Sequence, residues 1–211
     1  MFIQDRDLLV FEPNLFRDVV WVGQRLTVGV ASIGDVILAI EGADVDFENS
    51  GVEAGCVVTV SGVSYEVIER ISPTELVVSR LRIEGAAAPI VPTPVTDAQA
   101  WVVSFRPQIE MVHRQVLAML GLAVNGSGAG QLTEADITNP GELKRLEALG
   151  TLHLIFSSAS AAAGSPMNER AQMYRELFGE ERQRVRAMID TNGDGEADVV
   201  RRPSVGQLVR G

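Results

Sequence analysis

The sequence predicts an α+β protein, with a small antiparallel β-barrel or roll in the N-terminal half and a helical hairpin or bundle with a terminal β-hairpin in the C-terminal half. Two observations predict this division. From about Thr27 to Phe105, short runs of residues alternate between apolar and polar, as in half-buried strands. After Leu132, apolar residues recur at steps of three and four, as on one face of a helix. A chain of 211 residues can form one large domain or two modest ones.

Residues 1–26 are predicted to form an N-terminal arm that carries many large apolar side chains. Glu12-Pro13-Asn14 marks a turn in this arm, and a short helix is expected after Pro13. We expect the arm to contribute to the core. The alternative is that it lies across a neighbouring subunit, where its apolar surface would also be covered.

Residues 27–106 are predicted to form the β domain, with turns at Ser61-Gly62 and Ser72-Pro73-Thr74. Residues 83–100 are rich in Pro and Ala and show no periodicity, which predicts an extended strap over the surface or a loop between barrel strands. The predicted strands are Val36–Ile40, Cys56–Val60, Tyr65–Ile71, Leu76–Leu81 and Trp101–Phe105.

A helix is predicted over residues 107–124, with Ile109, Val112 and Val116 on one face and Gly121 as its stop. Residues 125–131 are rich in glycine and are predicted to be a flexible linker between the β domain with its helix and the C-terminal helices.

Residues 132–189 are predicted to form a helical hairpin. Its first helix, with an apolar stripe from Leu143 to Ala159, has two alternative starts. Thr133 with Asp136 is a weak capping box, and Asn139 followed by Pro140 and Glu142 is a stronger one. Gly164-Ser165-Pro166 ends this helix and starts the second, Met167–Ile189. So short a connection predicts antiparallel helices.

Residues 190–211 are predicted to form an Asp/Gly turn and a docking tail. Asp190, Asn192 and Asp194 place oxygen atoms at alternate positions before Gly195, as at the start of a calcium loop, and Asp198 adds a further oxygen. Position twelve is Arg201, where a calcium loop has a bidentate Glu. An Asx-rich turn that opens a hairpin is therefore favoured over a calcium site, and these four residues are the metal candidates in the chain.

Other side chains give no catalytic or cofactor-binding pattern, so we expect no enzyme. His113 and His153 lie in separate predicted helices without a spaced ligand partner, and no nucleophile elbow or phosphate-binding loop occurs. His113 is expected on a polar helix face, and His153 is expected to be a hydrogen-bonded histidine between helices. Cys56 is the single cysteine, which excludes an internal disulfide.

The formal net charge is −10, and it is unevenly placed. Residues 26–69 contain eight acidic residues and no Lys or Arg. Direct binding of free nucleic acid is not expected, because it requires clustered basic residues. The acidic stretch is either a solvated face or a surface that repels DNA or docks on a basic partner. The N-terminus lacks the basic residues of a signal peptide, and no apolar run reaches the roughly 18 residues of a membrane helix, so we expect a cytoplasmic protein and no membrane partner.

The last third of the chain, a helix pair followed by an Asp/Gly turn and a tail with Arg201-Arg202 and Leu208-Val209-Arg210, resembles the head–tail connector proteins of tailed bacteriophages and gene transfer agents, which are also called adaptor or head-completion proteins. The resemblance implies a structural protein of the virion neck. It would form a homo-oligomeric ring, dodecameric by the same resemblance, under the portal protein.

The resemblance also implies the partners. Besides the portal, they are a tail, stopper or terminator protein, with DNA only as cargo through the channel. The helical hairpin would form the ring body and residues 190–211 would contact other proteins. The protein would be found in the virion after assembly in the host cytoplasm. The alternative function is a bacterial binding module, a β-barrel plus helices that responds to calcium.

Overall fold

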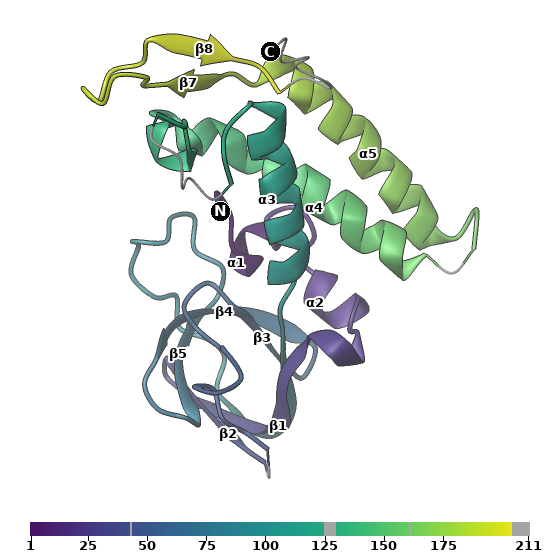
Figure 1. Cartoon of the computed structure of the whole chain (residues 1–211). Helices are drawn as coiled ribbons and strands as arrows, with labels where there is room; N and C mark the ends of the chain where they lie inside the picture. The colour runs from purple at the N-terminus through teal and green to yellow at the C-terminus, as the bar shows by residue number, and fades with distance from the viewer. Residues whose placement is uncertain (43, 125–129, 161, 204–211) are drawn as a thin grey trace. The chain divides into compact units, whose positions relative to one another are not determined.

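The computed structural model describes residues 1–42, 44–124, 130–160 and 162–203, with only the backbone of Val22. The chain forms two compact units. The barrel unit is Gln4–Arg106, and the helical unit is Pro107–Gly211 together with Met1–Ile3. The predicted α+β class is confirmed, with a closed antiparallel barrel in the N-terminal half and helices with a terminal β-hairpin in the C-terminal half (Figure 1).

The residues predicted as an N-terminal arm do not form a separate element. Met1–Ile3 cluster with the helical unit, and the rest belong to the barrel unit, where they form three short helices. Leu8, Leu15 and Phe16 are fully buried, as expected for an arm that contributes to the core. The helices are α1 (Asp5–Leu8), α2 (Leu15–Asp18) and η1 (Val22–Gln24).

The barrel unit is a closed sheet with strand order β1-β2-β5-β4-β3-β6, in which β6 pairs back onto β1 and every pair is antiparallel. Its interior is filled with side chains, among them the small ones of Ala31, Ala98 and Ala100 on β1 and β6. The strands are β1 (Arg25–Gly34), β2 (Ile37–Glu41), β3 (Val57–Val60), β4 (Val63–Arg70), β5 (Glu75–Ser79) and β6 (Val95–Val103).

Two strand predictions need correction. The prediction missed β1, because Val28 and Val30 lie on its exposed face while Gly29 and Ala31 face inward, which inverts the usual alternation. The predicted strap of residues 83–100 is a loop only up to Pro94. From Val95 onward it is strand β6, whose inward residues are alanines too small to give a periodic signal. The other four predicted strands form near their predicted positions. The Ser61-Gly62 turn also forms, and both its residues have positive φ, as a type I′ hairpin requires.

The helical unit is built on α4 (Lys144–Ala159), which is buried at every position from Leu146 to Leu152. It lies antiparallel to α5 (Pro166–Arg184), as predicted, and its apolar side chains share a core with α3 (Arg106–Met119) and β7 (Ala187–Ile189) (Figure 1). The remaining elements are η2 (Glu134–Asp136), η3 (Pro140–Leu143) and β8 (Val199–Arg201). No helix in the described ranges is long and apolar enough to cross a membrane.

The helix ends confirm one capping prediction and correct others. Ser165 caps α5 by accepting a hydrogen bond from Asn168, with Pro166 at the first position. The weak box at Thr133 and Asp136 forms, but around the short helix η2. The stronger box does not form, because the Asn139 amide bonds to the backbone of Arg186 and Met188 instead.

The predicted boundaries near the end of the chain also change. Helix α5 ends at Arg184 and not at Ile189, because residues 187–189 pair with β8 as a strand. The helix predicted over residues 107–124 ends earlier, at Met119, and the predicted stop Gly121 follows it with positive φ. Most of the predicted 125–131 linker, residues 125–129, and the tail from residue 204 lie outside the described residues.

Candidate functional site

The predicted metal candidates lie in the loop that joins β7 to β8. Asp190 accepts hydrogen bonds from the backbone N–H groups of Asn192, Gly193 and Gly195 at 3.0, 2.7 and 2.7 Å. Asp198 accepts from the backbone and hydroxyl of Thr191, both at 2.8 Å. The hydrogen bonds from Gly195 and Gly193 lower the pKa of Asp190, so this carboxylate is ionised while it holds the turn.

The conformation of this loop is therefore explained without a bound metal ion. The carboxylates of Asp190 and Asp198 fix an Asx-rich turn by satisfying its N–H groups, which is the arrangement that the sequence favoured over calcium. Within the described parts of the chain, no three His, Cys, Asp or Glu side chains are grouped so that they could hold a metal ion. Calcium binding by this loop stays a prediction to be tested by titration.

The helical unit contains a buried cluster that was not predicted. His113 of α3 is not on a polar face. It is buried, and its ring nitrogens lie 3.0 Å from the carboxylate of Glu147 and 3.1 Å from that of Glu134. The Phe2 ring meets the imidazole edge-on, with centroids 4.8 Å apart.

Glu147 and Glu134 differ in their surroundings. Glu147 is completely buried and also accepts from the backbone N–H of Phe2. Glu134 is partly exposed and pairs with the Met1 amino group at 2.9 Å. Burial alone would raise the pKa of Glu134, but hydrogen bonds from Met1 and His113 outweigh it and lower the pKa. The cluster connects α3, α4, η2 and the first residues of the chain.

The sequence did contain a signal for this cluster. His113 lies four residues after Ile109 and three before Val116, on the apolar side of its helix. Glu147 likewise follows Leu143 by four residues. Ionisable residues on an apolar helix face indicate a buried pair, because an unpaired buried charge is costly.

The barrel unit contains a second buried cluster, in which one carboxylate lies between two guanidinium groups. Glu66 of β4 is completely buried and forms ion pairs with Arg6 of α1 and with Arg82, the latter at 2.6 Å. Arg6 also donates to the carbonyl of Arg82, and Arg82 donates to the carbonyl of Ala87. The cluster attaches the loop of residues 83–94 to the barrel wall.

A groove of about 450 Å³, which we call the three-helix groove, lies between α3, α4 and α5. Gly150 is one of its lining residues, and side chains of the two other helices pack closely against it. A Cβ there would come within 2.8 Å of Val112 and 2.9 Å of the Phe178 ring. The wall is apolar, and the rim is polar or basic, without a carboxylate. The apolar residues are Met111, Val112, Leu154 and Phe178, and the polar ones are Gln115, His153, Arg175, Arg182 and Gln183.

The basic groups at this rim are free to bind an anion. Neither Arg175 nor Arg182 forms an ion pair with any residue that the structure describes. His153 is the predicted hydrogen-bonded histidine between helices, and its Nδ1 lies 2.9 Å from the carbonyl of Ala171 on α5. The groove thus combines an apolar wall with unpaired positive charge in a protein whose net charge is −10.

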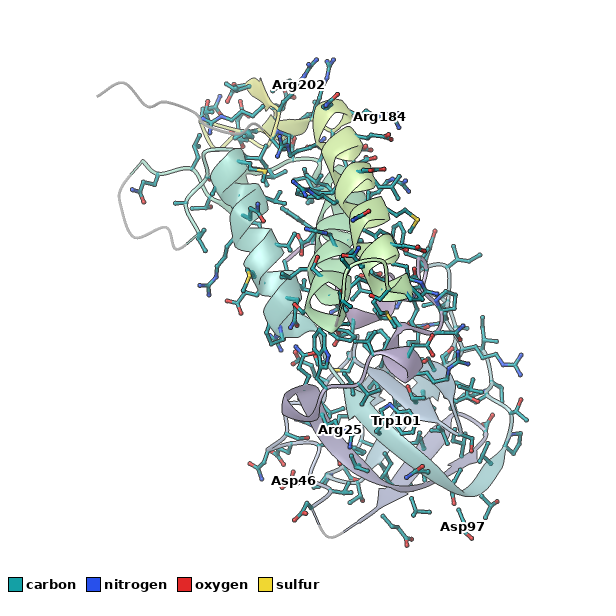
Figure 2. The ribbon with its side chains drawn as sticks, turned by 90° about the vertical axis from the view of Figure 1, so that its right-hand side faces the viewer. Arg25, Asp46, Asp97, Trp101, Arg184 and Arg202 are labelled. Carbon is teal, nitrogen blue, oxygen red and sulfur yellow. The ribbon has the colours of Figure 1, made fainter. Side chains whose placement is uncertain are left out.

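A smaller cavity of about 250 Å³ lies on the barrel beside Arg25 and Trp101 (Figure 2). The Trp101 indole donates to the carbonyl of Phe16 at 3.0 Å, and Arg17 at its edge already pairs with Asp18. Its polar groups are therefore largely engaged within the barrel unit.

Comparisons of this chain with protein-family models, with curated proteins and with solved structures found no match.

Proposed function

We propose that this protein is a structural component of the neck of a tailed bacteriophage or gene transfer agent, in which copies of the chain form a ring under the portal protein. The observation that carries the proposal is a set of large apolar side chains exposed on the helical unit. Met111, Met173, Met188 and Val200 are 42% to 60% exposed. They lie on α3, α5, β7 and β8, so more than one surface of this unit needs a partner. Exposed methionines are typical of adaptable protein interfaces.

The charge distribution supports the same proposal. Residues 26–69, which contribute β2, β3 and most of β1 and β4, contain eight acidic residues and no basic residue, and all eight except the buried Glu66 are at least partly exposed. A ring through which DNA passes gains from such a wall, because like charge prevents the duplex from binding to it. In this proposal α4 and α5 form the ring body, and the β7–β8 hairpin contacts the portal. The other face of the ring receives a tail, stopper or terminator protein, and the chain performs no catalysis.

The test is assembly with the portal. The purified chain is expected to be a monomer or weak oligomer, and mixing it with the portal ring of the same virus should give one complex whose native mass corresponds to the portal plus a ring of this protein. Met173→Glu should weaken assembly, whereas Val63→Glu, at an exposed position on the barrel, should not. Failure to bind the portal at tens of micromolar protein would refute the proposal.

The calcium-responsive binding module makes the opposite prediction for a simple experiment. A calcium site in the β7–β8 loop would raise the melting temperature in millimolar calcium. Because Asp190 and Asp198 already satisfy the N–H groups of this loop, we expect no shift. A shift that disappears in Asp194→Asn would favour the binding module.

A further inference from the structure

We infer that the loop of residues 83–94 of one copy inserts Ile83 and Glu84 into the three-helix groove of a second copy. This inference rests on the proposed function for the expectation that copies of the chain assemble. It names the surfaces that join them. The contact would pair the barrel unit of one subunit with the helical unit of the next.

The inserting loop presents an apolar side chain with nothing to cover it. Ile83 is fully exposed, and Ile90 and Val91 of the same loop are about half exposed. Glu84 is exposed and forms no ion pair with any described residue. A fully exposed isoleucine followed by a free carboxylate is an unfavourable surface for an isolated subunit and a suitable one for an interface.

The loop is held in this conformation by hydrogen bonds at three levels. At its base, Arg80 and Ile90 pair by a backbone bond of 3.0 Å, and Arg80 also donates to the Thr93 hydroxyl. In its middle, Arg82 is buried against Glu66 and donates to Ala87. Near the tip, Ala87 donates to the carbonyl of Glu84 at 3.0 Å. Because Arg82 points toward Glu66 on the barrel wall, Ile83 is directed to solvent. Little conformational entropy would be lost on docking such a loop.

The three-helix groove has the complementary chemistry. Its apolar wall of Met111, Leu154 and Phe178 suits an aliphatic side chain. Arg175 and Arg182 provide unpaired positive charge for one carboxylate, and no acidic residue lines the groove to compete with it. The match of an apolar wall and basic rim to an isoleucine beside a glutamate is what selects this loop as the occupant.

The contact joins two different surfaces of the subunit, and this determines which assemblies it can form. A loop on one surface and a groove on another make a heterologous contact, which each added copy can repeat. Such a contact generates a ring where the rotation closes, in agreement with the ring expected under the portal. A contact of identical surfaces would instead stop at a dimer.

Disulfide trapping tests the inference directly. Cys56 does not interfere, because it is buried and burial raises the pKa of its thiol to about 12. One chain carries Ile83→Cys and the other Met111→Cys, and the two are mixed and oxidised, both free at high concentration and bound to the portal. We expect a mixed disulfide dimer in large excess over either homodimer. The control pair, Val63→Cys with Ser158→Cys, uses exposed residues outside the proposed contact.

The charge of the contact is tested in the same assay. Arg175→Glu together with Arg182→Glu, in the chain that carries Met111→Cys, should lower the yield of mixed dimer about tenfold or more. Glu84→Arg in the chain that carries Ile83→Cys should restore it. These positions are on the surface, and a melting curve of each variant verifies that it folds.

The outcomes separate the two proposals. Assembly with the portal without preferential mixed dimers overturns the Ile83 contact and leaves the neck function standing. Mixed dimers without assembly on the portal support the contact and refute the neck function. Mixed dimers at the yield of the control pair, in free and portal-bound protein alike, overturn the contact.

Discussion

The two units of this protein each bury a charged cluster, but the clusters have opposite composition. In the barrel unit, the carboxylate of Glu66 lies between the guanidinium groups of Arg6 and Arg82. In the helical unit, the imidazole of His113 lies between the carboxylates of Glu134 and Glu147. The barrel cluster has one carboxylate for two guanidinium groups, whereas the two carboxylates of the helical cluster face the imidazole of His113 and the Met1 amino group.

The two clusters also connect different parts. The barrel cluster fixes a surface loop, since Arg82 is bonded through its backbone and its side chain. The helical cluster joins α3 to α4 and the first residues of the chain, all within the core of that unit. The buried charges of the barrel cluster thus fix the conformation of a surface loop, and those of the helical cluster fix the packing of α3 against α4. Arg184, the last residue of α5, and Arg202, which follows β8, lie at one end of the helical unit and belong to neither cluster (Figure 2).

The largest effect is expected from breaking the barrel cluster. Glu66→Gln leaves two buried guanidinium groups without a counter-charge, which should lower the free energy of unfolding by about 3–5 kcal/mol. Both tryptophans, Trp21 and Trp101, lie in the barrel unit, so their fluorescence in urea reports on this unit. Glu69→Gln, at an exposed position of the same strand, is the control and should change stability by less than about 0.5 kcal/mol. Equal effects of the two changes would show that the cluster does not stabilise the barrel.

The stability of the barrel unit should also depend on pH. Asp5 is buried, and desolvation raises its pKa from 3.8 to about 6, against hydrogen bonds from Ser104 and Phe105. The folded protein therefore binds a proton more tightly than the unfolded chain, so the stability that Asp5 contributes is highest below about pH 4 and falls as pH rises to about 6. The fall is about 3 kcal/mol.

The measurement is the free energy of unfolding of the barrel unit, followed by tryptophan fluorescence at several pH values. Asp5→Asn should flatten the decrease between pH 4 and 6. A slope identical in both proteins would mean that Asp5 is not the group responsible.

The predictable parts of the fold were those with strong local periodicity or turn chemistry. The stripe of α4, the Ser165-Pro166 start of α5 and the Ser61-Gly62 turn all follow from neighbouring residues. Strand β1 did not follow, because Gly29 and Ala31 face inward where valine or isoleucine is usual. The prediction that Asn139 caps a helix was wrong, because its side-chain amide bonds to the backbone of Arg186 and Met188, which are 47 and 49 positions further along the chain.

The clusters and the groove were harder to predict for the same reason. Glu147 and Phe2 are 145 positions apart, and Arg6 bonds with Arg82 across 76 positions. Position on an apolar helix face could have indicated that His113 and Glu147 are buried, but not that they meet. The close packing of Val112 and Phe178 beside the groove depends on Gly150, and a glycine contributes nothing to periodicity.

Breaking the helical cluster should cost less than breaking the barrel cluster. In Glu147→Gln, the amide oxygen can still accept from His113 or Phe2, but the charge is lost, so we expect a decrease of about 2–3 kcal/mol in the free energy of unfolding. Far-UV circular dichroism follows this unit, which contains the long helices. Glu142→Gln, exposed just before the same helix, is the control. A loss larger than that of Glu66→Gln would reverse the ranking of the two clusters.

The smallest effects distinguish side-chain packing from helix propensity within the helical unit. Gly150→Ala places a methyl group against Val112 and Phe178, and such overpacking costs about 1–3 kcal/mol, of which the higher helix propensity of alanine offsets about 1 kcal/mol. Gly179→Ala, on the facing helix, meets nothing within 4 Å and should instead stabilise by up to about 1 kcal/mol. The two variants make the same chemical change in helices that pack together. Opposite signs in their melting temperatures would therefore establish that the convergence of three helices at Gly150, and not helix propensity, sets the stability at the groove.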